Sequence, residues 1–84
     1  MKITVKFFFD FQEITGEKEI EIEIKKESTI KELIKLLEAS FPGVKEITEH
    51  HEDYSVLLNG IHVNLTKKLK ENDVIDLFSV IDGG

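Results

Sequence analysis

Cysteine is absent from this sequence of 84 residues. Its absence excludes disulfide bonds, a nucleophilic thiol, thiolate metal ligands and a side chain that could form a thioester. No apolar run approaches the length that spans a membrane, and the N-terminus lacks the apolar core of a signal peptide. We therefore expect a cytoplasmic protein that contacts no membrane, in which any sulfur chemistry would have to use the main-chain carboxylate.

Arginine is absent as well, because all 11 basic residues are lysines. They are outnumbered by 17 acidic residues, and the net charge is −6. A surface of this sign repels phosphate backbones, so we expect no nucleic-acid partner and instead a protein partner with a basic docking face. The short chain allows one small domain with a modest core, and its 40% hydrophobic and 33% charged residues are typical of a folded protein.

Alternation of apolar and polar residues predicts two strands near the N-terminus. The first covers residues 3–9, in which Ile3, Val5, Phe7 and Phe9 occupy one side, and the second covers residues 20–24. Residues 14–17 supply a turn between them. The two strands therefore form a hairpin whose loop is longer than two residues.

A helix follows, because the apolar spacing changes to i, i+3, i+4 and i+7. Thr29 and Glu32 form a capping box at its start, and Pro42-Gly43 ends it. Residues 43–53 are polar and predict an exposed loop. The apolar positions of the helix are Ile30, Leu33, Ile34 and Leu37.

Three more strands are predicted over residues 54–58, 61–63 and 74–80. Asn59-Gly60 and Asn72 are suited to the positive φ angles of the turns before the second and third of them. Since a right-handed crossover brings the last strand beside the first in parallel, the order predicts a β-grasp.

The predicted fold class is therefore α+β, with a mixed sheet of four to five strands and one main helix packed on one face. The whole chain, residues 1–84, would form a single domain, with residues 80–84 as a flexible C-terminal tail.

The tail ends in Gly83-Gly84. Glycine stabilises a fold poorly, but two residues without Cβ can pass through a narrow channel and leave the last carboxylate open to attack. A partner enzyme could adenylate that carboxylate, and a sulfur or nitrogen nucleophile could then displace AMP. The alternative is a frayed end of small residues, which is common at chain termini.

Two aromatic residues are expected on the sheet face that the helix leaves uncovered. Phe8 lies on the face of the first strand opposite Phe7, and Phe78 lies on the face of the last strand opposite Leu77. If these strands are neighbours, Phe8 and Phe78 form an apolar patch near the tail, and such patches often mark docking surfaces. The alternative is that the sheet curls and half-buries both rings.

The histidines do not predict a metal site. His50, His51, Glu52 and Asp53 are adjacent loop residues, which rarely point at one ion, and His62 is distant in sequence. A domain this small also has little concavity for a catalytic site of its own.

Several segments occur in a characteristic order and spacing along essentially the whole chain. They are Phe7-Phe8-Phe9 with Glu13-Ile14-Thr15-Gly16, Thr29-Ile30 with Leu33 and Leu37, Phe41-Pro42, Leu58-Asn59, Leu69-x-x-Asn72-Asp73 and Gly83-Gly84. Together they resemble the MoaD-like branch of the MoaD/ThiS ubiquitin-like sulfur carriers, which is the small subunit of molybdopterin synthase.

The resemblance implies a carrier without an active site, which binds no cofactor and no metal. An E1-like adenylyltransferase that uses ATP would adenylate Gly84, which would then become a thiocarboxylate. The loaded tail would insert into the molybdopterin synthase large subunit and donate sulfur for molybdenum cofactor biosynthesis. The residues expected to contact these partners are Gly83, Asp82, Ile81, Val80, Phe78 and Phe8.

The sequence departs from the family pattern at two places. Ser79-Val80-Ile81-Asp82 replaces a proline-rich stretch that many members carry, and Asn72 replaces a glycine. Because of the first departure, the molecule that receives the sulfur or the acyl group of Gly84 is not fixed by the resemblance. A ubiquitin-like modifier joined to lysines and a sulfur carrier for tRNA thiolation are alternatives, and a non-catalytic β-grasp interaction module with an inert tail is a third.

Overall fold

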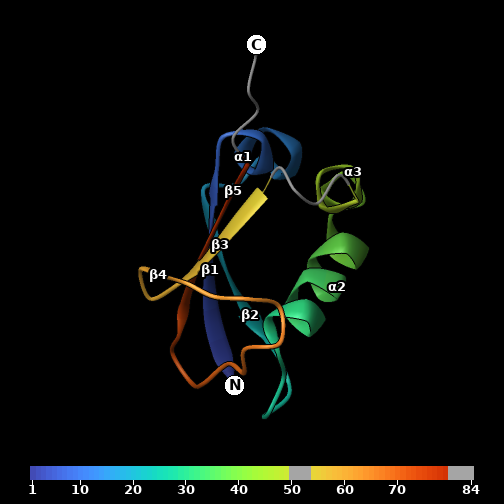
Figure 1. Ribbon diagram of the computed structural model, residues 1–84. Coiled ribbons are helices and arrows are strands. Elements are labelled where there is room, and N and C mark those ends of the chain that lie inside the picture. Colours follow the sequence, from blue (N-terminus) through green and yellow to red (C-terminus); the bar gives the residue numbers. More distant parts are fainter. Residues whose placement is uncertain (50–53, 80–84) are drawn as a thin grey trace.

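The computed structural model describes residues 1–49 and 54–79 of the chain. Their strands form one five-stranded mixed sheet in the order β2-β1-β5-β3-β4 (Figure 1). The predicted β-grasp is confirmed, with the main helix, α2, along one face of the sheet. The strands are β1 (Lys2–Phe8), β2 (Glu19–Glu23), β3 (Tyr54–Leu58), β4 (Ile61–His62) and β5 (Val74–Ser79), and the helices are α1 (Asp10–Thr15), α2 (Ile30–Ser40) and α3 (Val44–Thr48).

The centre of the sheet is a parallel pair made of its first and last strands. β1 runs beside β5 with Thr4 opposite Val74 and Phe8 opposite Phe78. β2 is antiparallel to β1, and β3 is antiparallel to β5. This is the crossover arrangement that the strand order predicts.

The alternating residues of the central strands divide the sheet into a core face and an open face. Ile3, Val5 and Phe7 of β1 and Ile75 and Leu77 of β5 are buried under α2. The helix contributes its predicted apolar stripe to the same core, which explains why its side chains recur at helical spacing. The residues of that stripe, all buried, are Ile30, Leu33, Ile34 and Leu37.

The predicted capping box at the start of α2 is present. The Thr29 hydroxyl accepts a hydrogen bond from the Glu32 N–H, and the Glu32 carboxylate accepts one from the Thr29 N–H. The next two backbone donors bond to the loop that precedes β5, because Ile30 N–H donates to the Lys67 carbonyl and Lys31 N–H to the Leu65 carbonyl, each at 3.0 Å. The loop is therefore fastened to the N-terminus of the helix.

Two short helices are absent from the sequence prediction. Residues 10–15 form α1 where only a turn over 14–17 was expected, and residues 44–48 form α3 where an exposed loop was expected. Both predictions were wrong because each helix is fixed by burying one apolar residue, Phe11 in α1 and Val44 in α3, each with no exposed area. Gly43 lets the two approach, since a Cβ there would lie 2.6 Å from Cγ2 of Ile14.

The predicted positive φ angles are confirmed at both asparagines. Asn59 has φ 49° beside Gly60 at 87°, and Asn72 has φ 67°. Among the described residues, no helix is long and apolar enough to cross a membrane.

Candidate functional site

The predicted aromatic pair exists on the open face of the sheet. Phe8 and Phe78 are register partners in β1 and β5, and their rings meet edge to face with centroids 6.5 Å apart. Phe8 is 39% exposed and Phe78 is half-buried. The alternative of two half-buried rings therefore holds for Phe78 alone, and the pair keeps an exposed apolar surface at the end of the two central strands.

Phe9 extends this surface, and the sequence analysis placed it wrongly. The alternation put Phe9 inward with Phe7, yet Phe9 is 67% exposed and has φ 54° and ψ −123°. The chain leaves the strand after Phe8 and turns into α1, so Phe11 is the buried residue instead. Its ring meets that of Tyr54 edge to face, with centroids 6.0 Å apart. The acidic Asp10 and Glu13 in the first turn of α1 were the available signal for this helix start.

We call Phe8, Phe9 and Phe78 the aromatic end. A shallow depression beside it is lined by Phe8, Phe9, Gln12, Glu13 and Gly16, so the surface continues from the sheet onto α1. Clustered exposed aromatic side chains are typical of protein interfaces, where they supply large contact areas with few rotatable bonds.

An unsatisfied carboxylate oxygen lies next to the aromatic end. Asp76 shares the open face with Phe78, and its Oδ1 is buried without a hydrogen-bond partner among the described residues. Lys6 is its register partner in β1, but their charged groups do not come within ion-pair distance. A buried acceptor without a partner lowers the stability of the fold.

The expected reacting group lies outside the described residues. β5 ends at Ser79, and Val80, Ile81, Asp82, Gly83 and Gly84 follow it in the sequence. The aromatic end is therefore the described surface at the last residues of β5, immediately before the predicted tail. The roles of these five residues stay a prediction.

Titratable groups near this end include one with a shifted pKa. Burial raises the pKa of Tyr54 above its usual value of 10.0, and the negative charge of Glu38 adds to the effect. The phenol is therefore neutral at physiological pH.

Within residues 1–49 and 54–79, no cluster of three or more histidine, aspartate or glutamate side chains could hold a metal ion. His50, His51, Glu52 and Asp53 lie outside these ranges.

We predict that Phe9→Gly raises the free energy of unfolding by roughly 1 kcal/mol. The backbone of Phe9 adopts angles that glycine tolerates far better, and the exposed ring loses little burial when removed. Thermal unfolding measures the change, with Phe9→Ala as the control that removes the ring but keeps a Cβ. Equal stability of the two variants would show that the backbone of Phe9 is not strained.

The comparisons with known proteins match nearly the whole chain. The sequence model of the ThiS family matches residues 5–84. The chain belongs to the ThiS family. The resemblance to the MoaD/ThiS carriers is thus confirmed. The relatives of this ThiS-family member are small ubiquitin-like carrier and modifier proteins, not enzymes.

Three proteins illustrate the sequence and structural similarity of this ThiS-family member. Small archaeal modifier protein 3 of Haloferax volcanii is 27% identical over 92 residues, which cover all of both chains. A Pyrococcus furiosus protein, provisionally assigned as subunit 1 of a molybdopterin converting factor, is 28% identical with a TM-score of 0.83 over 93% of this chain and 95% of its own. SAMP1 of Haloferax volcanii shares the fold, with a TM-score of 0.91 over all of both chains at 20% identity.

The matching structures include complexes with a second protein, such as the BexX/CysO complex of Amycolatopsis orientalis. Another is the complex of subunits 1 and 2 of the molybdopterin-converting factor from Helicobacter pylori, 27% identical over all of both chains with a TM-score of 0.60. Binding to a second subunit therefore occurs among the structural relatives of this ThiS-family member.

Proposed function

We propose that this chain is a sulfur carrier that acts as the small subunit of a molybdopterin synthase in the cytoplasm. The observation that carries the proposal is the ThiS-family match, which runs through residue 84 and so includes Gly83-Gly84. The similarity to the Pyrococcus furiosus protein supports molybdopterin synthesis as the destination of the sulfur.

The proposed chemistry takes place at the carboxylate of Gly84. In the first step a carboxylate oxygen attacks the α-phosphorus of ATP, the bond to the β-phosphate oxygen breaks, and pyrophosphate leaves. In the second step hydrosulfide attacks the acyl carbon, AMP leaves with the electron pair of the broken C–O bond, and the remaining S–H proton goes to solvent. The product is a thiocarboxylate, whose sulfur the large subunit transfers to the pterin precursor.

Both steps belong to partner proteins, because the carrier supplies only the carboxylate and a docking surface. We assign docking to the aromatic end, which lies directly before the tail. An E1-like adenylyltransferase and the synthase large subunit would use this surface in turn, with Val80, Ile81, Asp82 and Gly83 inside the partner. Support comes from the two-subunit complex of the Helicobacter pylori relative.

Intact-mass spectrometry tests the proposal. The protein is incubated with the E1-like enzyme of its own genome, ATP and a sulfide donor, and we expect the mass increase of one oxygen-to-sulfur exchange at the C-terminus. A reaction without ATP is the control and should leave the mass unchanged. An unchanged mass with an enzyme that forms the adenylate would contradict a sulfur-carrier role.

The second candidate is a ubiquitin-like modifier, and the match to small archaeal modifier protein 3 favours it. A lysine amine would then displace AMP and leave an isopeptide bond to Gly84. Immunoblots of cell extract would show a ladder of conjugates that disappears when Gly84 is deleted. Conjugates without any thiocarboxylate would select this function over sulfur transfer to a pterin.

A further inference from the structure

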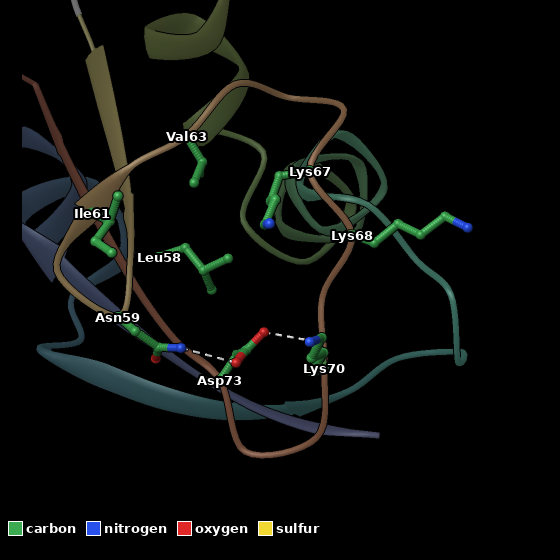
Figure 2. A pocket seen from close by; sticks show the side chains of 8 residues that line it. All are labelled: Leu58, Asn59, Ile61, Val63, Lys67, Lys68, Lys70 and Asp73. Atoms are coloured by element: carbon green, nitrogen blue, oxygen red, sulfur yellow. Dashed lines mark hydrogen bonds between the residues drawn. The ribbon is translucent and has the colours of Figure 1, made fainter.

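A second surface lies at the opposite end of β5 from the aromatic end. It is a hollow of about 280 Å³ between the β3–β4 hairpin and the loop that leads into β5 (Figure 2). Leu58 forms its floor, and Ile61 and Val63 form one wall, with Ile61 69% exposed. This volume falls below that of sites for drug-sized ligands, so it suits one large side chain rather than a whole small molecule.

The walls of the hollow are held by hydrogen bonds. The buried carboxylate of Asp73 accepts from the Asn59 side-chain amide at 3.0 Å and from the Lys70 backbone N–H at 2.7 Å (Figure 2). Asn59 in turn accepts from the Val74 N–H at 2.9 Å. Because the opposite wall is fastened to the N-terminus of α2, the hollow is formed before any ligand arrives, which lowers the entropic cost of binding.

The charge around the hollow is opposite to that of the chain. The eight residues that line the hollow include three lysines and one acidic residue, Asp73, a charge of +2, whereas the whole chain carries −6. Lys67 extends toward the hollow, whereas Lys68 turns away and pairs with Glu27 at 2.9 Å (Figure 2). In the described part of the chain, no ion pair involves Lys67 or Lys70.

A strand edge borders the same hollow. β4 is the last strand in the sheet order, and its outer side pairs with no strand among residues 1–49 and 54–79. Unpaired backbone groups of an edge strand can bind an extended peptide, while neighbouring pockets select its side chains.

We propose that this hollow binds an extended acidic segment of a partner protein. One aliphatic side chain of the segment fills the space over Leu58, its carboxylates lie beside Lys67 and Lys70, and its backbone runs along β4. Since Val74 and Phe78 lie at opposite ends of β5, roughly 13 Å apart at about 3.3 Å per residue, the segment can remain bound while the aromatic end is occupied. The proposal does not depend on the chemistry of Gly84.

NMR titration of the isotope-labelled protein tests this binding. The probe is the peptide acetyl-Gly-Glu-Asp-Ile-Ile-Glu-Asp-Gly-amide, added to about 1 mM, which detects even millimolar affinity. We expect amide shifts confined to residues 58–73. The double variant Lys67→Ala/Lys70→Ala should raise the dissociation constant about tenfold, and added salt should weaken binding to the wild type. Ile61→Ser removes the exposed wall and should also weaken binding, without threatening the fold.

The matched control is Lys26→Ala/Lys35→Ala, which removes two exposed lysines elsewhere and should bind the peptide as the wild type does. Deletion of Gly84 should also leave peptide binding unchanged, which separates this test from that of the sulfur carrier. Absence of shifts, or equal weakening by both double variants, would overturn the proposal. So would self-association that requires Lys67 and Lys70, because the occupant would then be the acidic strand β2 of a second copy.

Discussion

Deletion of Gly84 is expected to abolish thiocarboxylate formation in the presence of the activating enzyme, ATP and a sulfur donor. The terminal carboxylate would then belong to Gly83 and would lie short of its former position by up to about 3.3–3.6 Å, the reach of one residue. A misplacement of about 1 Å can already cost roughly 100-fold in rate. Intact-mass spectrometry of the product measures the loss.

The deletion should leave the folded domain intact, since glycine has no side chain to pack in a core. A melting temperature equal to that of the wild type would confirm that the variant is folded. Lys26→Ala/Lys35→Ala is the control, because it changes two exposed side chains outside the tail and the aromatic end, and it should retain the product. Full thiocarboxylate formation after deletion of Gly84 would refute the proposal that the carboxylate of this residue is the group that reacts.

Replacement of Phe7 by alanine is expected to have the largest effect on stability. Phe7 is 1% exposed in the central strand β1, and its ring meets that of Phe41 edge to face at 5.9 Å. Truncation of a buried phenylalanine costs about 3–5 kcal/mol. The total free energy of unfolding of a domain of this length is roughly 4–13 kcal/mol. We therefore expect a melting temperature lower by roughly 15–30 °C, measured by circular dichroism.

Phe8→Ala is the matched control for this prediction. It removes the same ring from the next residue of the same strand, but on the open face, where the side chain is 39% exposed. We expect a small change in melting temperature and a clear loss of affinity for the activating enzyme, because exposed aromatic anchors often dominate interfaces. Equal destabilisation by the two variants would contradict the assignment of Phe8 to a docking surface.

The sheet and α2 could be predicted from the sequence because each shows its own periodicity. β3 begins and ends where the alternation predicted, and the capping box at Thr29 marks the start of α2. The two short helices show no periodicity, since five or six residues span less than two turns and gain little stability alone. Asp10 and Glu13 were a local signal for the start of α1, but they do not fix the helix without its buried residue. Both helices exist because Phe11 and Val44 are buried against the rest of the domain, which is a tertiary effect.

The two surfaces were predictable to different degrees. The Phe8–Phe78 pair followed from strand alternation and the parallel crossover, so local pattern and topology sufficed. Phe9 was misplaced because one positive φ angle ended the alternation. The lysine-bordered hollow was not predictable, since it depends on how residues 63–73 pass over Leu58, and no local pattern encodes that path.

The parallel pairing of β1 with β5 has a consequence for folding. Thr4 and its register partner Val74 are 70 positions apart in the sequence, so the centre of the sheet has a very high contact order. Until residues 74–79 have left the ribosome, β2-β1 and β3-β4 are two separate hairpins without a shared core. The two hairpins are therefore joined last during synthesis. An incompletely translated chain would expose the unpaired edges of β1 and β3 to chaperones and proteases.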